Sequence, residues 1–225
     1  MTTDTPTLIA HRGCPLRGPE NTLAAFRAAA DHADVIELDA RRCGSGEVVV
    51  FHDDGLDRLL GVEGTVAETD LTELQSHTVL DSSETVPTLA EAFEAIPDHV
   101  AVNVELKGLD IAEDVASVVT EATNEALISS FAPGALRGYA SVADDPTALI
   151  TAANWTPAVE TAVELGCDAI HPQHELVSET RVETAHDHDL DVNCWTIRET
   201  GPVDGLREAG VDGLIVDDWA LVEDA

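Results

Sequence analysis

Lysine is almost absent from this sequence. Lys107 is the only one, and the other basic residues among the eleven are arginines. Aspartate and glutamate number 44, which gives a formal net charge of −33. This charge argues against nucleic acid as a partner, because phosphate backbones attract basic surfaces. The acidic residues are spread along the whole chain, which predicts a salt-adapted (halophilic) protein from a cytosol where screening reduces self-repulsion.

Long apolar runs are also missing. No segment approaches the ~18 apolar residues that a membrane-spanning helix needs, and residues 1–10 lack the basic and long apolar stretches of a secretory signal. We therefore expect a cytoplasmic protein without stable membrane association. Hydrophobic residues make up 44% of the chain in regular patterns, which argues against disorder.

Cysteine is scarce and scattered. Cys14, Cys43, Cys167 and Cys194 form no CxxC pair and have no zinc-site spacing. The pattern favours small, reduced, partly buried side chains, with disulfides as the open alternative.

Short apolar runs alternate with helical patterns. Residues 7–13, 34–42 and 48–53 read as strands, and residues 21–33 as an amphipathic helix. The turn "GSGE" separates the second and third strands too closely for a parallel crossover, so these two strands form a hairpin.

After the hairpin, residues 54–87 are polar and weakly patterned, which predicts an insertion loop with about one helical turn. Thr88 and Glu91 form a capping box at the start of a helix over 88–96. Alternation then resumes, with strands at 100–107, 126–131, 147–151, 168–172, 191–197 and 212–217, and helices at 110–123, 133–142, 155–166, 178–189 and 201–209.

Without the hairpin arm 48–53, eight strands remain, separated by helices or long connections. This order predicts an α/β fold with a parallel sheet, namely a compact (β/α)8 TIM barrel, with a hairpin after strand 2 and a small insertion. We expect one domain over residues 1–225. Its last helix should be missing or very short, and its functional site should lie at the carboxyl ends of the strands.

Charged side chains occupy two of these strand ends. Glu37 and Asp39 are two residues apart and so share one face of their strand, and Glu105 and Lys107 have the same spacing. Each pair alone is typical of a salt bridge or a solvated strand edge. Together, the three carboxylates offer the oxygen ligands that Mg²⁺ or Ca²⁺ prefers.

Two histidines should join them. His11 and Arg12 end the first strand, and pairing about "GSGE" brings His52 level with Leu38, above the carboxylates. Histidines exchange protons near neutral pH, and Arg12 with Lys107 can hold a phosphate. The set indicates phosphoryl-ester chemistry.

These motifs resemble the glycerophosphodiester phosphodiesterase family. "IAHRGCPLRGPENTLAAF" is similar to its HRG...PENT segment, "DVIELDARRCGSGEVVVFHD" to its ExD...HD segment and "NVELKG" to its ExK. The resemblance covers the whole chain, and the family's (β/α)8 barrel agrees with the independent reading of the strands. The family's frequent "TD" motif reads Val216-Asp217 here.

The resemblance implies a role for each site residue. Glu37, Asp39 and Glu105 would bind the divalent cation, and His11 and His52 would be the catalytic acid/base pair. The substrate-binding residues would be Arg12 and Lys107 at the phosphate, Glu20 with Asn21 at the border of the site, and Trp195 on the pocket wall.

The implied function is metal-dependent hydrolysis of a small-molecule glycerophosphodiester to glycerol phosphate and an alcohol, a step of lipid metabolism. One alternative is a phospholipase-type phosphodiesterase of the same barrel class. Another is a non-catalytic barrel that binds divalent cations or phosphate esters. His171 and His174 in "HPQH" admit a second metal site, although paired histidines at a strand end are commonly loop or pocket-wall residues.

Overall fold

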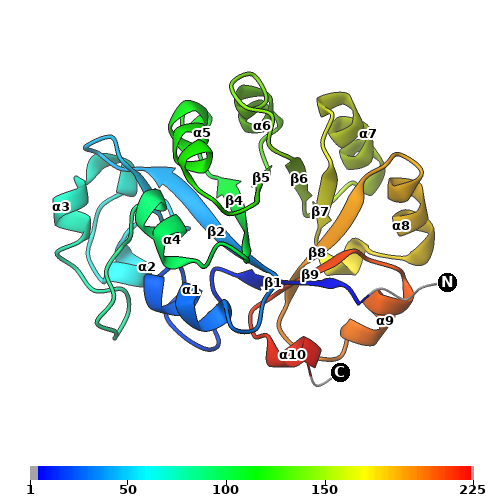
Figure 1. The fold of residues 1–225 in the computed structure, drawn as a ribbon, viewed down its shortest axis with the longest axis horizontal. Coiled ribbons are helices and arrows are strands. Elements are labelled where there is room, and N and C mark those ends of the chain that lie inside the picture. Colours follow the sequence, from blue (N-terminus) through cyan, green and yellow to red (C-terminus); the bar gives the residue numbers. More distant parts are fainter. Residues whose placement is uncertain (1–4, 224–225) are drawn as a thin grey trace.

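The computed structural model describes residues 5–223 and confirms the predicted barrel. The strands pair in the order β1-β9-β8-β7-β6-β5-β4-β2, and β1 also pairs with β2, which closes the ring. Figure 1 shows the helices arranged around the strands. The wall consists of eight parallel strands: β1 (Thr7–His11), β2 (Val35–Arg42), β4 (Ala101–Leu106), β5 (Ala126–Ser130), β6 (Thr147–Thr151), β7 (Ala169–Pro172), β8 (Asp191–Ile197) and β9 (Gly213–Val216).

Helices connect the strands and pack apolar faces against them. At the start of α1, the Thr22 hydroxyl accepts a hydrogen bond from the Ala25 amide at 3.3 Å, and the predicted capping box of Thr88 and Glu91 opens α4. The helices are α1 (Leu23–Ala29), α4 (Leu89–Ala95), α5 (Ala112–Glu121), α6 (Pro133–Tyr139), α7 (Trp155–Leu165), α8 (Glu179–His186), α9 (Val203–Glu208) and the very short α10 (Ala220–Glu223). Over residues 5–223, no helix has the length and apolar character needed to cross a membrane.

The predicted hairpin is present. Strand β3 (Val48–Val50) runs antiparallel to β2 with Val50 opposite Ala40, outside the closed ring. The Phe51 amide extends the pairing by donating to the Asp39 carbonyl at 2.8 Å. This register places His52 beside the end of β2 that carries the carboxylates.

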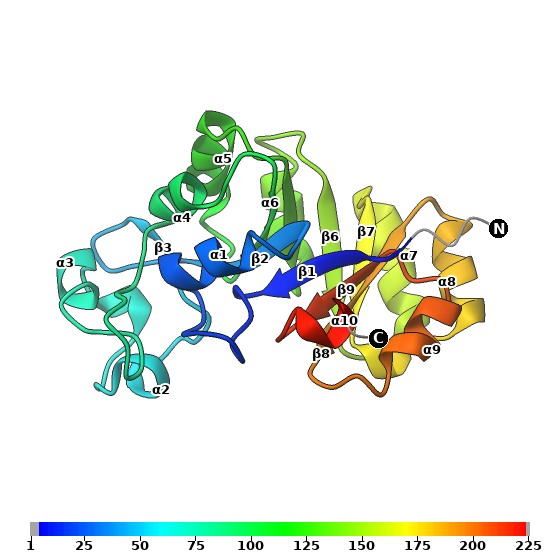
Figure 2. The same cartoon turned by 60° about the horizontal axis from the view of Figure 1, so that its bottom comes forward.

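The prediction for residues 54–87 was wrong in detail. The segment contains α2 (Asp57–Leu60), a 3-10 helix η1 (Val66–Glu68) and α3 (Leu71–Leu74). It also has its own hydrophobic cluster, which includes Leu56, Leu59 and Leu74. Each helical segment is about one turn long, so no helical period repeats in the sequence. Figure 2 shows this insertion at one end of the molecule, far from α7, α8 and α9.

Aspartates join neighbouring strands at the amino-terminal end of the barrel. Each of these aspartates directly precedes one strand. Its carboxylate accepts a hydrogen bond from a backbone amide near the beginning of the neighbouring strand. Asp34 accepts from Leu8 at 2.9 Å, Asp168 from Thr147 at 2.9 Å and Asp212 from Val192 at 2.7 Å. Part of the acidic composition therefore stabilises the register of the barrel.

All four cysteines are free and buried. This agrees with the expectation of reduced thiols and decides against disulfides in this structure. Burial raises the pKa of the Cys14 and Cys194 thiols to about 12. A thiol that stays protonated is a poor nucleophile, so these side chains contribute packing.

Candidate active site

Three buried carboxylates meet at the carboxyl ends of β2 and β4. Glu37 and Asp39 lie on one face of β2, and Asp39 is in register with Glu105 of β4. One oxygen from each of the three lies within 4.8 Å of the others. The cluster forms because alternate residues of a strand point to the same face, and β2 and β4 are adjacent parallel strands.

The cluster has the character of a hard-cation site. Burial opposes the ionisation of Asp39, but the positive charges of Lys107 and Arg12 hold its pKa below the usual range. Burial, together with the charge of Asp39, raises the pKa of Glu105 to about 7. The Asp39 Oδ1 atom is buried, and its contact with the Lys107 ammonium at 3.0 Å lacks hydrogen-bond geometry. A divalent cation would relieve the repulsion among the carboxylates, so the donor set fits such an ion.

Two cations border the carboxylates. The Lys107 ammonium lies 3.0 Å from Asp39 Oδ1 and also contacts Glu105. The Arg12 guanidinium lies 3.2 Å from Asp39 Oδ2, and the Arg12 backbone amide donates to Glu37 at 2.9 Å. Both side chains line the cavity above the carboxylates, where they can neutralise an anionic substrate group.

His11 is held by a carboxylate from the last strand. Its Nδ1 atom lies 2.6 Å from Asp217 Oδ1, and Arg198 Nε donates to the other oxygen of Asp217 at 2.8 Å. Burial would raise the pKa of Asp217, but the hydrogen bond from His11 and the contact with Arg198 lower it overall. An ionised Asp217 keeps the proton of His11 on Nδ1, which leaves Nε2 free to exchange a proton with a ligand.

His52 has the same kind of support. Its Nδ1 atom lies 2.6 Å from Asp53 Oδ1, and a hydrogen bond from Arg58 lowers the pKa of Asp53 to about 2. Arg58, from α2 of the insertion, also donates to both oxygens of Glu20 at 2.8 Å. Burial lowers the pKa of His52, which favours a neutral ring able to accept a proton.

These groups surround a cavity of about 140 Å³. Its apolar side is formed by Trp195 and Phe131, whose rings meet edge to face with centroids 5.5 Å apart. The Trp195 indole donates to the His171 carbonyl at 2.7 Å, which fixes its orientation. One side of the cavity is therefore lined by charged side chains and the other by aromatic rings.

The structure brings together most of the residues singled out in the sequence. The cavity is lined by His11, Arg12, Glu37, His52, Glu105, Lys107 and Trp195, with Asp39 directly below. Glu20 is not part of this lining. Its Oε1 atom accepts a hydrogen bond from Arg12 Nη1 at 2.9 Å. Asn21 is also outside the lining, where it donates to Asp39 at 2.8 Å.

Three supporting residues were missed. Asp217 directly follows the last barrel strand, β9, so it had a positional signal similar to that of the other site residues. Asp53 directly follows His52, and a His-Asp dipeptide alone is uninformative. Arg58 reaches Glu20 across 38 residues of sequence, and nothing in the weakly patterned insertion indicated that contact.

The pair His171 and His174 does not meet as a metal site. His171 is buried, and burial lowers its pKa to about 3, while its Nε2 atom lies 3.1 Å from Asn193 Nδ2. His174 instead pairs with Glu175 at 3.5 Å. Among residues 5–223, the acidic triad is the one group with ligand atoms close enough for a shared ion.

Comparison with known proteins gives a consistent match. The family model described as the glycerophosphoryl diester phosphodiesterase family matches residues 11–221. A glycerophosphodiester phosphodiesterase from Caldanaerobacter subterraneus subsp. tengcongensis is 31% identical over 230 residues, covering 94% of this chain and 93% of the relative.

Solved structures agree. A phosphodiesterase from Oleispira antarctica, in complex with the product sn-glycerol-3-phosphate, superposes with a TM-score of 0.89 at 26% identity and covers 98% of this chain and 96% of its own. A glycerophosphodiester phosphodiesterase from Thermotoga maritima superposes with a TM-score of 0.86 at 25% identity, with 98% of each chain covered.

Proposed function

The chain belongs to the glycerophosphoryl diester phosphodiesterase family and is a phosphoric diester hydrolase; from this premise we propose that it hydrolyses glycerophosphodiesters to glycerol phosphate and an alcohol by metal-dependent histidine acid/base catalysis. The observation that carries the proposal is the meeting of a buried carboxylate triad with two carboxylate-bound histidines around one cavity. We further propose that the whole chain is one domain and works in a cytoplasm of high ionic strength, as its composition suggests.

Glu37, Asp39 and Glu105 would hold a divalent cation, Mg²⁺ or Ca²⁺. Such a cation would supply positive charge near the phosphate and would make a nearby hydroxyl more acidic. Lys107 and Arg12 offset the charge that builds on the phosphoryl oxygens during the reaction. The Trp195 ring and its neighbour Phe131 bound the side of the cavity where the alcohol group rests.

His11 and His52 exchange the protons. One imidazole takes a proton from the nucleophile at Nε2, and the other donates a proton to the leaving alcohol oxygen. Asp217 and Asp53 hold the two rings in the orientation and tautomer that this requires. The nucleophile is either water or the neighbouring glycerol hydroxyl. Only the second path forms a cyclic phosphate, so detection of that product distinguishes them.

The test is turnover of glycerophosphocholine, followed in high salt with and without EDTA. We expect hydrolysis that EDTA abolishes and that added Mg²⁺ or Ca²⁺ restores. His52→Ala should lose about 10²–10⁴-fold in kcat while its melting temperature stays close to that of the wild type. Tight cation binding without turnover across a panel of diesters would instead favour the non-catalytic binding barrel.

One observation favours the phospholipase-type alternative. Leu109 and Phe131 follow the neighbouring strands β4 and β5 and are 67% and 48% exposed, and Phe131 lines the active-site cavity. This apolar rim would suit a substrate whose alcohol carries an acyl chain. Under that alternative, lysophosphatidylcholine is turned over faster than glycerophosphocholine, and Leu109→Ser slows the first substrate alone.

A further inference from the structure

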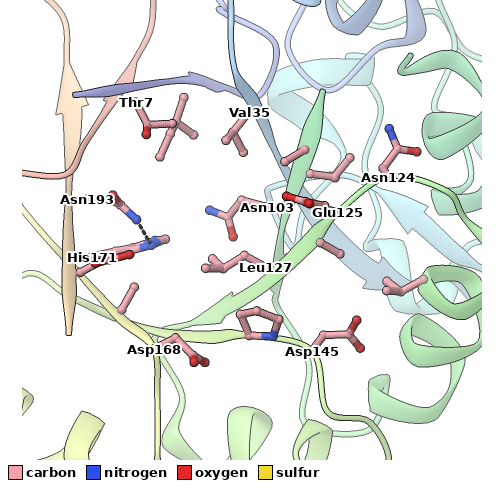
Figure 3. Close-up of a pocket in the computed structure, with 18 of the residues that line it drawn as sticks. Thr7, Val35, Asn103, Asn124, Glu125, Leu127, Asp145, Asp168, His171 and Asn193 are labelled. Atoms are coloured by element: carbon pink, nitrogen blue, oxygen red, sulfur yellow. Dashed lines mark hydrogen bonds between the residues drawn. The ribbon is translucent and has the colours of Figure 1, made fainter. Parts of the chain in front are cut away.

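A second and larger cavity, about 700 Å³ in volume, opens at the amino-terminal end of the barrel. Six of the barrel strands contribute lining residues near their first positions, for example Thr7 of β1, Val35 of β2 and Asp191 of β8, and Pro146 and Asp212 line it just before β6 and β9. Figure 3 shows Thr7 and Val35 with other lining side chains around the cavity. The active site lies at the opposite, carboxyl ends of the same strands.

The cavity exists because the first layer of the barrel interior is made of small side chains. Barrels of this class are usually filled by bulky branched residues. Here Thr7, Ala101 and Ala169 line the opening. At Gly213 the Asn193 side chain takes the space that a Cβ atom would need, since such an atom would lie 2.3 Å from Asn193 Oδ1. Sequence and packing together therefore leave this end of the barrel unplugged.

The floor of the cavity presents an unused hydrogen-bond acceptor. Asn103 is 2% exposed, and its Oδ1 atom has no hydrogen-bond partner among the described residues. Figure 3 shows its amide pointing into the middle of the cavity. A buried acceptor without a donor costs about 1–3 kcal/mol. The neighbouring His171 ring is already engaged with Asn193 at 3.1 Å. Asn103 lies between this cavity and the active-site cavity and lines both, so a ligand or solvent in the amino-terminal cavity can supply the missing donor.

The rim of the cavity is acidic. Asp212 contacts His186 at 2.8 Å, and Asp145 accepts from the Tyr139 hydroxyl at 2.8 Å. Burial raises the pKa of Asp191, and the charges of Asp212 and Asp168 raise it further, a sign of concentrated negative charge. No lysine or arginine is among the residues around the cavity, whereas five acids are: Glu125, Asp145, Asp168, Asp191 and Asp212.

Between floor and rim the wall is partly apolar, with Ile9, Val102 and Leu127. We propose that this cavity binds a small organic cation with N–H donors at both ends and an apolar middle, of the alkyl diammonium class. One ammonium donates to Asn103 Oδ1, and the other lies among the rim carboxylates. Asn103 is two strand positions inside Ala101, a depth of roughly 6.6 Å, which suits a four-carbon diamine.

The experiment is calorimetric titration of the full chain with butane-1,4-diamine at a fixed KCl concentration. We expect saturable binding of one diamine per chain. Asp191→Asn should weaken binding about three- to tenfold, and Ala101→Leu should abolish it by filling the mouth. Asp81→Asn, the same change at an exposed position of the insertion, should leave the dissociation constant unchanged.

The bis-quaternary analogue of the diamine, with both nitrogens trimethylated, keeps the two charges and the four-carbon chain but has no N–H donor; it tests the hydrogen bond to Asn103 and should bind more weakly than the diamine. Equal binding of both cations would overturn the assignment of a hydrogen-bonded amine. Absence of saturable diamine binding, or equal weakening by Asp81→Asn and Asp191→Asn, would overturn the site itself. If Ala101→Leu does not fold, the comparison of Asp191→Asn with Asp81→Asn still shows whether the diamine binds at this cavity. Because the readout is heat of binding, it is independent of the proposed hydrolysis.

Discussion

Lys107 lies at the most crowded point of the active site, between Asp39 and Glu105. Its side chain is 11% exposed, so a larger group has little room. A guanidinium is planar and wider than an ammonium and needs a different arrangement of acceptors. We expect Lys107→Arg to fold normally but to lose at least about tenfold in kcat for glycerophosphocholine. Arg27→Lys, which involves the same two residue types on the exposed face of α1, is the control and should keep full activity. Full activity of Lys107→Arg would contradict the proposed contact with the phosphate.

Asp217 and Asp218 are adjacent, yet only Asp217 contacts a proposed catalytic residue. Asp217 binds His11, whereas Asp218 binds Arg17 at the surface at 2.7 Å. We expect Asp217→Asn to lower kcat at least about tenfold, with a smaller change in KM, because the amide no longer holds the His11 proton on Nδ1. The pH–rate profile should also change. Asp218→Asn is the matched control, and equal effects of the two substitutions would mean that Asp217 has only a structural role.

The proximity of individual side chains could be predicted where position on a strand carried the signal. Glu37, Asp39 and Glu105 could be placed together because strands alternate with a period of two and parallel strands end at one rim. The partners of His11 and His52 required knowledge of which loops lie side by side. Arg58 is the clearest case, since its contact with Glu20 depends on the fold of the insertion.

The insertion of residues 54–87 shows the same limit for elements. Elements with several turns or a regular alternation were predicted within a few residues, as were the hairpin and the capping box of Thr88. The one-turn helices α2 and α3 were missed because their stability comes from tertiary packing around Leu74 and its neighbours rather than from a local period.

This packing gives a prediction at the scale of the element. Leu74 is fully buried in the cluster of the insertion, so Leu74→Ala should lower the free energy of unfolding by about 2–5 kcal/mol. It should also reduce turnover, because the insertion positions Arg58 behind Asp53. Urea unfolding followed by circular dichroism measures the first effect. Leu109→Ala, at a 67% exposed position, is the control and should change the free energy of unfolding by about 0.5 kcal/mol or less. A similar loss in both variants would show that the cluster contributes little.

At the scale of the whole molecule, alternation of strands and helices was enough to predict the closed barrel, its strand count and the end at which the acidic triad lies. The amino-terminal cavity could not be predicted in this way. Its volume depends on how the small side chains of Thr7, Ala101 and Ala169 leave one layer of the barrel interior unfilled, and the sequence does not give the alignment of that layer directly. The local sequence pattern thus determines the barrel, while the packing of side chains from different strands determines the cavities inside it.

The formal net charge of −33 is also a property of the whole molecule. Self-repulsion of this size destabilises a compact state at low ionic strength, and the screening length falls from about 10 Å at 0.1 M salt to about 3 Å at 1 M. We expect the melting temperature to rise steadily between 0.1 and 2 M KCl, in one cooperative transition if the chain is a single domain. A variant with six exposed acids replaced by amides (D31N, D81N, E94Q, E121Q, E160Q and E164Q) should respond less steeply to salt. Scanning calorimetry of both proteins in KCl separates screening from general salt effects, because the latter act equally on both. Parallel curves would mean that the acidic surface has a role other than adaptation to salt.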